Sequence, residues 1–444
     1  MRGFLASSIG VTCAAALALP LTLPAAAAPA SAPAPAVQPA SGARSASTTA
    51  APDLPGSTQS LPLTPRTRTL GAAPEQGLTR ADVHRFSLVG VTWTDPDTEL
   101  RGQVQVRTRA TGTGEWSGWQ DIDTHNEDHG ADPGTAERDS GHVHGSTAPL
   151  WVGDSDGVDV RVRATGAATR TAGGVEEQLP PLPTGLHLEL VDPGAAEAPL
   201  AGAGATTNRN RTATPRLAAT EIPALSKQAT ERDMVALGAK AQPYIGPRPR
   251  IVTRHGWGAD EKLREKGFVY TKKVKAAFVH HTATGNNYRC SQAPSVIRGI
   301  YRYHVKSSGW RDIGYNFLVD KCGTIYEGRA GGVAKAVMGA HTLGFNTNSM
   351  GIAVLGTFGS AKPSSAAVTA IAKLTAWKLG LYGVNPRGKT YLKSGGGNLY
   401  RKGKNVRLNV ISGHRDGFAT ECPGRQLYGK LGSARSTSAR YQGR

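Results

Sequence analysis

The sequence predicts a small all-β, sandwich-like domain followed by a larger mixed α/β domain. Residues 81–192 contain short stretches of alternating apolar and polar residues between clusters of Gly, Asp and Pro, a pattern typical of strands and turns. Residues 249–435 combine short apolar runs with helical patterns, as in strands covered by helices. The residues around these two ranges are rich in Ala, Gly, Pro, Ser and Thr and bury too little apolar surface to fold alone.

The N-terminus has the pattern of an export signal. Arg2 precedes an apolar run over residues 4–23, and small residues follow at 25–28. This order predicts a cleaved signal peptide over residues 1–28. A membrane anchor is the alternative, but Pro20 interrupts the run and no basic stop follows it. We therefore expect a secreted protein without stable membrane insertion after cleavage.

Low-complexity segments surround the predicted domains. Residues 29–80 are predicted to be a disordered tether, and residues 193–248 a second linker. Within that linker, residues 219–237 are compatible with a short helix or with plain linker. Residues 436–444 are predicted to be a flexible tail.

Each predicted element rests on a local pattern. In the first domain, alternation predicts strands at 86–93, 103–108 and 158–162. In the second domain, short apolar runs predict strands at 276–281, 315–320, 325–327, 350–357 and 406–412, and one-sided apolar periodicity predicts helices at 294–305 and 364–381. Residues 389–404 are predicted to form a basic hairpin before the last strand.

The charge is strongly asymmetric. The chain carries 52 Lys and Arg against 33 Asp and Glu, a net charge of +19, and residues 251–444 hold 31 of the basic and 8 of the acidic residues. Such an excess favours a polyanionic partner: nucleic acid, an anionic membrane or an anionic wall polymer. Export and the lack of aromatic residues within the basic runs argue against nucleic acid. A solvated basic face without a specific ligand is the alternative.

Two histidines and a cysteine follow predicted strands. His280 ends the strand at 276–281, His414 follows the strand at 406–412, and Cys422 lies eight residues further along. Zinc favours such nitrogen and sulfur ligands, and three of them leave a fourth position for water, whose pKa the metal lowers to about 7. A purely structural role for each histidine is the alternative at this point.

The cysteine count supports this interpretation. Three cysteines lie outside the predicted signal, so at least one is not in an intramolecular disulfide. Cys290 and Cys322 flank a predicted helix and strand and could close a loop of about thirty residues. We expect this pair to form the disulfide and Cys422 to be a metal ligand; a disulfide that includes Cys422 is the alternative.

Between Trp257 and Gly424 the sequence resembles the peptidoglycan recognition proteins and the related zinc-dependent N-acetylmuramoyl-L-alanine amidases of bacteria and phages. The resemblance covers under half of the chain and implies their fold, a mixed central sheet flanked by helices. Residues 81–192 look like an accessory domain found beside such amidases in actinobacteria. The matching blocks are FVHHTA (278–283), GWRDIGYNF (309–317), IYEGR (325–329), GAH (339–341), NSMGI (348–352) and residues 413–424.

The resemblance implies a cofactor and an activity. It makes His280, His414 and Cys422 the ligands of Zn²⁺ and makes Tyr315 and Thr420 catalytic residues. Members that only bind commonly lose the cysteine ligand, which this chain keeps. The implied reaction is hydrolysis of the amide between the lactyl group of N-acetylmuramic acid and L-alanine of the stem peptide. A non-catalytic peptidoglycan-binding protein is the alternative.

The resemblance also implies the substrate. Gly309, Trp310 and Arg329 go with diaminopimelate-type stem peptides, because an arginine can pair with their extra carboxylate. His304 and His341 are expected to line the same groove, although packing in a helix core is the alternative for His304. The expected partners are peptidoglycan and anionic wall polymers rather than nucleic acid, and the expected location is extracellular and cell-wall associated.

Overall fold

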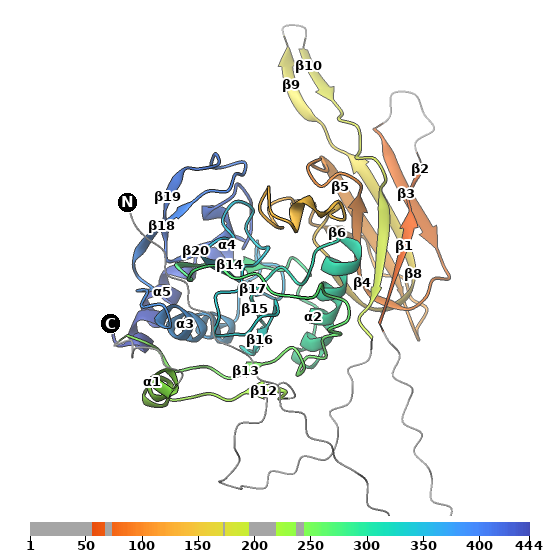
Figure 1. Ribbon diagram of the computed structural model, residues 1–444. Coiled ribbons are helices and arrows are strands. Elements are labelled where there is room, and N and C mark those ends of the chain that lie inside the picture. Colours follow the sequence, from red (N-terminus) through yellow and green to blue (C-terminus); the bar gives the residue numbers. More distant parts are fainter. Residues whose placement is uncertain (1–55, 67–72, 172–173, 195–218, 237–243) are drawn as a thin grey trace, which may run out of the picture. The chain divides into compact units, whose positions relative to one another are not determined.

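The computed structural model describes residues 56–66, 73–171, 174–194, 219–236 and 244–444 (Figure 1). Within these residues, one larger sheet forms an N-terminal all-β domain and another lies in a C-terminal α/β domain. The predicted fold class is therefore confirmed. The predicted signal peptide lies outside the described residues. No described helix has the length and apolar character needed to cross a bilayer.

The N-terminal domain is built on a nine-stranded sheet whose main order is β1-β11-β4-β8-β3-β2. The 15-residue strand β8 joins its parts, because it pairs with β4 at its start and with β3 and β5 further along. Alternate residues of these strands enter one apolar cluster. The strands are β1 (Ser57–Pro62), β2 (Thr64–Pro65), β3 (Glu75–Arg80), β4 (Phe86–Trp93), β5 (Gly102–Ala110), β6 (Gln120–Ile122), β7 (Gly145–Ser146), β8 (Leu150–Ala164), β9 (Ala167–Thr171), β10 (Gly174–Gln178) and β11 (His187–Asp192).

The connection between β6 and β7, residues 123–144, is irregular apart from one 3-10 turn, η1 (Arg138–Ser140). We call it the β6–β7 segment. Irregular polar segments usually lie at the surface, where water satisfies their backbone groups. This one is partly buried, which means that another part of the protein covers it. Its buried polar residues are Asn126, Asp128, His129, Asp132 and Glu137.

The C-terminal domain contains a seven-stranded mixed sheet in the order β12-β13-β16-β15-β17-β14-β20. Strands β15, β17, β14 and β20 are parallel to one another, so their carboxyl ends lie at one edge. The strands are β12 (Glu221–Ile222), β13 (Ile251–Val252), β14 (Ala276–His281), β15 (Phe317–Val319), β16 (Ile325–Glu327), β17 (Ser349–Val354), β18 (Lys389–Lys393), β19 (Asn405–Asn409) and β20 (Ile411–Gly413). The helices are α1 (Lys227–Ala236), η3 (Cys290–Gln292), α2 (Ala293–Arg302), the π-helical turn η4 (Tyr303–Ser307), α3 (Ser365–Gly380), η5 (His414–Asp416), α4 (Arg425–Tyr428) and α5 (Leu431–Gln442).

Helices cover both faces of this sheet. On β17, Ile352 and Val354 pack in the apolar cluster that contains α3, whereas Ala353 packs in the cluster that contains α2. On β14, Val279 belongs to the α3 side. Because successive side chains of a strand alternate between its faces, the next residue, His280, points away from α3. This alternation places His280, the first predicted ligand, on the face of the sheet opposite α3.

The two domains share an apolar core. Side chains of β4, β8 and β11 pack with those of α2 in one cluster. In η4, which continues α2, the phenol of Tyr303 donates hydrogen bonds to the carbonyl oxygens of Val91 and Thr147 at 3.3 and 3.1 Å. Gly90 approaches the same ring so closely that a Cβ would lie 2.4 Å from its oxygen. Both α2 and its continuation η4 therefore contact the N-terminal domain.

The structure differs from the predicted organisation in three segments. Strands β1 to β3 lie within residues 29–80, which were expected to be a tether, and β12 lies within the expected linker, 193–248. Helix α1 also lies in that linker and corresponds to the short helix considered for residues 219–237. Helix α5 extends through the expected tail, 436–444, as far as residue 442. These elements are short or polar, and long-range pairing stabilises them: β1 is half-buried and gains its partners from β11.

Cys290 and Cys322 form a disulfide that joins η3 to the turn after β15, with their Cα atoms 6.2 Å apart. Cys422 is free and buried. The bridge anchors the start of α2 to the sheet. It leaves the Cys422 thiol available for another role.

We predict that the double substitution Cys290→Ser and Cys322→Ser lowers the free energy of unfolding by about 3–4 kcal/mol, because loss of the bridge frees a long loop in the unfolded chain. The two cysteines are 32 residues apart in the sequence. Guanidinium unfolding of the oxidised chain and the double variant measures the difference. Equal free energies of unfolding would contradict the prediction.

Candidate metal centre

The three predicted ligands meet at the edge where the parallel strands end. His280 is near the end of β14, and His414 begins η5 directly after β20, which is the parallel neighbour of β14. Nδ1 of His280 lies 3.0 Å from Nδ1 of His414 and 3.8 Å from Sγ of Cys422. All three side chains are buried. The fold therefore brings together donor atoms that are up to 142 residues apart in the sequence.

The donor atoms are spaced as zinc requires. With zinc–nitrogen bonds of about 2.0–2.1 Å and zinc–sulfur bonds of about 2.3 Å, tetrahedral ligands lie roughly 3.3–3.6 Å from one another. The observed separations of 3.0 and 3.8 Å bracket that range. Two buried imidazoles and a buried thiol that face a common point thus fit a zinc ion.

Burial sets the protonation of these groups. It lowers the pKa of His414 to about 3 and, together with the nearby His414, lowers the pKa of His280 well below its usual value. Both imidazoles are therefore neutral at neutral pH, as ligands must be. Burial raises the pKa of the Cys422 thiol well above its usual value. A cation at this point would offset that penalty and stabilise the thiolate.

Hydrogen bonds on the far side of each ring fix the ligand nitrogens. Nε2 of His414 lies 3.1 Å from the carbonyl oxygen of Asp128, and a proton donated there leaves Nδ1 free to bind a metal. Nε2 of His280 lies 3.4 Å from Oγ1 of Thr342. The orienting group of His414 comes from the N-terminal domain, in the β6–β7 segment.

A third histidine, His129 of the β6–β7 segment, joins the cluster as its fourth donor. One donor atom each of His129, His280, His414 and Cys422 lies within 4.8 Å of the others. Nδ1 of His129 is 2.6 Å from Oδ1 of Asp128. Its Nε2 is buried and has no hydrogen-bond partner among the described residues. Such an orphaned nitrogen beside three donor atoms is suited to be a fourth metal ligand.

The predicted catalytic residues lie in a cavity beside the cluster, which also contacts Cys422 and His129. The Tyr315 ring centroid is 5.5 Å from that of His280 and 5.7 Å from that of His129. Burial raises the pKa of the Tyr315 phenol well above its usual value, so the hydroxyl stays protonated and can donate a hydrogen bond. Oγ1 of Thr420 accepts a hydrogen bond from the backbone N–H of Cys422 at 3.1 Å.

Four of the expected substrate-binding residues extend from this cavity along η4 and the loops that follow. The ring of His341 is 5.2 Å from that of His280, and His304 stacks on Trp310 with ring centroids 4.3 Å apart. Gly309 adopts a left-handed conformation with φ 72°. The side chains of His304, Trp310 and His341 are buried. The ring centroid of His304 lies 5.8 Å from that of Tyr315, so its expected place in the groove stays a prediction.

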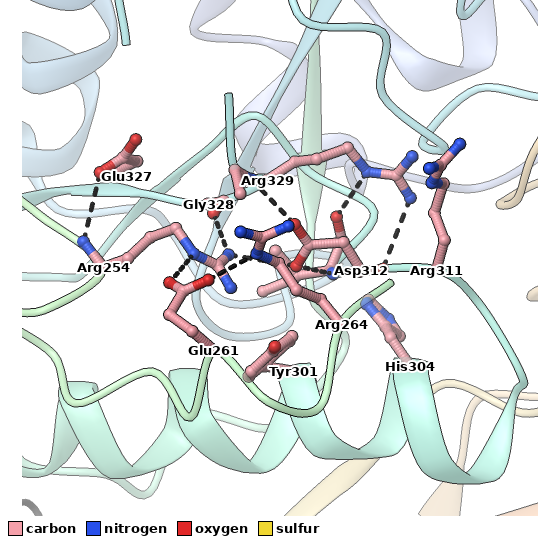
Figure 2. A network of polar contacts seen from close by, with 12 residues as sticks. Arg254, Glu261, Arg264, Tyr301, His304, Arg311, Asp312, Glu327, Gly328 and Arg329 are labelled. Atoms are coloured by element: carbon pink, nitrogen blue, oxygen red, sulfur yellow. Dashed lines mark hydrogen bonds and ion pairs between the residues drawn. The ribbon is translucent and has the colours of Figure 1, made fainter. Parts of the chain in front are cut away.

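Arg329, the fifth of these residues, is held in the polar network of Figure 2. Its Nε donates to the carbonyl oxygen of Ile313 at 2.9 Å. Asp312 accepts from the backbone of Ala330 at 2.9 Å and pairs with Arg254 at 3.1 Å. These contacts fix the direction in which the Arg329 guanidinium points.

The guanidinium of Arg329 is paired with Glu137 of the β6–β7 segment. Its Nη1 and Nη2 donate to the two carboxylate oxygens at 2.8 Å each, and the two side chains are only 5% and 3% exposed. Two parallel bonds of this kind are the geometry in which arginine recognises carboxylates. A carboxylate from the chain itself therefore stands where a substrate carboxylate was expected.

The sequence patterns do not reveal His129 or Glu137 as site residues. Both lie well over a hundred residues before their partners and in a different domain. One signal was available: residues 123–144 contain four histidines and several acidic residues in a segment without strand or helix periodicity. That composition marks a segment with polar contacts but does not identify its partner.

Comparisons with known proteins agree with this geometry. Residues 270–425 match the family described as N-acetylmuramoyl-L-alanine amidase, and residues 43–181 match a family described as Rv3811 N-terminal galactose-binding domain-like. Peptidoglycan-recognition protein SC2 of Drosophila simulans is 31% identical over 183 residues, which are 41% of this chain and 84% of that protein. Peptidoglycan-recognition protein SC1a of Drosophila melanogaster is 33% identical over 192 residues, 42% of this chain and 87% of that protein.

Among solved structures, peptidoglycan recognition protein LE in complex with tracheal cytotoxin matches with 32% identity and a TM-score of 0.32, over 41% of this chain and 92% of that chain. The family match and the two relatives identify the C-terminal domain as a domain of the peptidoglycan-recognition and amidase type. The chain belongs to the peptidoglycan recognition protein and N-acetylmuramoyl-L-alanine amidase family. The predicted family membership is thereby confirmed.

We predict that Cys422→Ser and His280→Ala each lower zinc affinity by more than about 100-fold, the upper end of what loss of an outer-shell contact costs. The exposed His255 provides a matched control, and His255→Ala should retain wild-type affinity. Competition with a chromophoric chelator measures affinity, and circular dichroism verifies the fold. Wild-type zinc affinity in a folded Cys422→Ser protein would refute the ligand assignment.

Proposed function

We propose that the protein is a secreted, cell-wall associated, zinc-dependent N-acetylmuramoyl-L-alanine amidase. It hydrolyses the amide between the lactyl group of N-acetylmuramic acid and L-alanine of the stem peptide. The observation that carries the proposal is the convergence of His280, His414 and Cys422 beside the hydroxyl-bearing Tyr315. A domain that only bound peptidoglycan would have no need of a buried, oriented ligand set next to such a donor.

The residues divide the chemistry between them. His280, His414 and Cys422 would hold zinc, which would polarise the scissile carbonyl and activate a water molecule. Tyr315 donates a hydrogen bond to the carbonyl oxygen as negative charge develops on it. Thr420 lies in the same cavity and contributes a second hydroxyl. A donor placed at the developing oxyanion commonly contributes about 3–4 kcal/mol to transition-state stabilisation.

We propose diaminopimelate-type stem peptides as the substrate class. Arg329 is positioned by its own network and already binds a carboxylate bidentately in this structure, which supports recognition of the extra carboxylate of diaminopimelate. Gly309, Trp310, His304 and His341 would form the rest of the groove. The basic surface, which includes the hairpin of β18 and β19, would hold the enzyme near stem carboxylates and wall phosphates.

Product analysis tests the proposed function. The zinc-loaded full chain is incubated with diaminopimelate-type muropeptide, with and without a chelator, at enzyme concentrations and times sufficient to detect slow turnover. We predict two products by mass, a lactyl-bearing saccharide and a free stem peptide, both lost on chelation and restored by zinc. Cleavage at a different bond, or cleavage that survives removal of the metal, would contradict the proposal.

We predict that Tyr315→Phe lowers kcat about 100- to 1,000-fold with little change in KM, because its hydrogen bond strengthens only in the transition state. Tyr382→Phe is the matched control, since that hydroxyl donates to the carbonyl of Ala334, away from the site. Steady-state kinetics of the two variants and the wild type give the ratio. A kcat for Tyr315→Phe close to that of Tyr382→Phe would remove Tyr315 from the catalytic group.

A further inference from the structure

The β6–β7 segment covers the candidate site along its length. Asp128 and Gly130 make backbone hydrogen bonds to Leu343 and Ala340, in the loop that carries His341. These contacts come from a different domain. The segment therefore contacts the C-terminal domain beside the candidate metal centre.

Asp132 anchors the middle of the segment. It accepts hydrogen bonds from the backbone N–H of Gly344 at 2.8 Å and from Nδ2 of Asn346, and it is buried. Burying a carboxylate is costly unless donors compensate it. Both donors, from Gly344 and Asn346, belong to the loop beside the site. The segment therefore makes specific polar contacts with the C-terminal domain.

His129 lies where a fourth metal ligand would stand. A zinc site that performs hydrolysis keeps one position open for water and substrate, whereas a site with four protein ligands is closed. Nε2 of His129 is the buried, unpartnered nitrogen beside the His280, His414 and Cys422 donors. Its Nδ1 lies 2.6 Å from Oδ1 of Asp128, and a hydrogen bond to a carboxylate in this position orients an imidazole for binding a metal through its other nitrogen.

The carboxylate of Asp128 adds a negative charge beside the cluster of donor atoms. Oδ2 of Asp128 is buried without a hydrogen-bond partner and lies 3.5 Å from Nδ1 of His414. A divalent cation held by the Cys422 thiolate retains one positive charge, which the Asp128 carboxylate would balance. An ion at the cluster would therefore provide a partner for Nε2 of His129 and a charge to balance Oδ2 of Asp128.

Glu137 closes the second half of the site. Its carboxylate takes both terminal nitrogens of Arg329 in a buried, bidentate pair. The backbone N–H of Arg311 also contacts Glu137 at 3.3 Å. A stem-peptide carboxylate cannot pair with Arg329 until Glu137 leaves, so this side chain competes directly with the substrate.

We propose that the β6–β7 segment is a built-in inhibitor of the amidase site: His129 occupies the coordination position that hydrolysis needs open, and Glu137 mimics the substrate carboxylate on Arg329. The inference rests on the proposed function. It makes the full chain a latent form whose activity requires the segment to leave the site while the domain core remains folded.

Two substitutions in the full chain test the two contacts separately. His129→Ala removes the fourth ligand, with His142→Ala as control because His142 is an exposed histidine of the same segment. Glu137→Gln keeps the shape of the side chain but removes its charge, with the exposed Asp139→Asn as its control. The conservative change at Glu137 keeps the test usable if His129→Ala does not fold.

Three readouts are compared. The visible spectrum of the cobalt-substituted chain reports coordination and should change for His129→Ala but not for His142→Ala. Binding of a diaminopimelate muropeptide to the metal-free chain, measured by calorimetry, should strengthen at least about tenfold for Glu137→Gln but not for Asp139→Asn. Hydrolysis by the zinc-loaded His129→Ala chain should be at least about tenfold faster than by the wild type.

The outcomes separate this inference from the proposed function. A changed cobalt spectrum and tighter muropeptide binding, without hydrolysis in any variant, would support closure of the site by the segment and refute the amidase. An unchanged spectrum with unchanged binding would overturn the inhibitor even if the chain hydrolyses muropeptide. Slower hydrolysis in folded His129→Ala and Glu137→Gln chains would also overturn it, because the segment would then be part of the active machinery.

Discussion

The constraint on which the site depends is the burial of three donor groups around one point. His280, His414 and Cys422 are buried from water. Burial raises the pKa of the Cys422 thiol well above its usual value, and the nearby Arg415 offsets only part of that rise. Burial of polar groups without partners is unfavourable. Parallel strands β14 and β20 hold the two histidines at one edge of the sheet, so the fold maintains this arrangement. A metal ion at this point would offset that cost, and the proposed chemistry depends on such an ion.

The N-terminal domain contributes polar groups to the same buried site. It supplies the carbonyl that orients His414, the buried carboxylate of Asp128 and the unpartnered nitrogen of His129. It also supplies the carboxylate that pairs with Arg329. Because its sheet shares an apolar core with α2, these contacts belong to a docked domain and not to a loose tail. A domain docked in this position can restrict access to the site without any change in the C-terminal domain.

Local patterns in the sequence predict most of the fold and the site residues that the C-terminal domain contributes. The buried strand that carries His280 near its end and the strand before His414 are short apolar runs, and their position next to polar residues marks them as site elements. Helix α5 was missed because it packs through small and polar residues: Thr375 of α3 and Ser438 join by a hydrogen bond of 3.0 Å. His129 was missed because its role depends on the docking of a second domain, which no local periodicity encodes.

The most direct measurement is the zinc-edge X-ray absorption spectrum of the full chain. Four protein ligands from the two domains should give one sulfur at about 2.3 Å and three nitrogens at about 2.0–2.1 Å around the metal. A zinc shell without sulfur would contradict the assignment of Cys422 and, with it, the metal centre. A shell with sulfur but with an oxygen in place of the third nitrogen would preserve the metal centre and contradict its closure by His129.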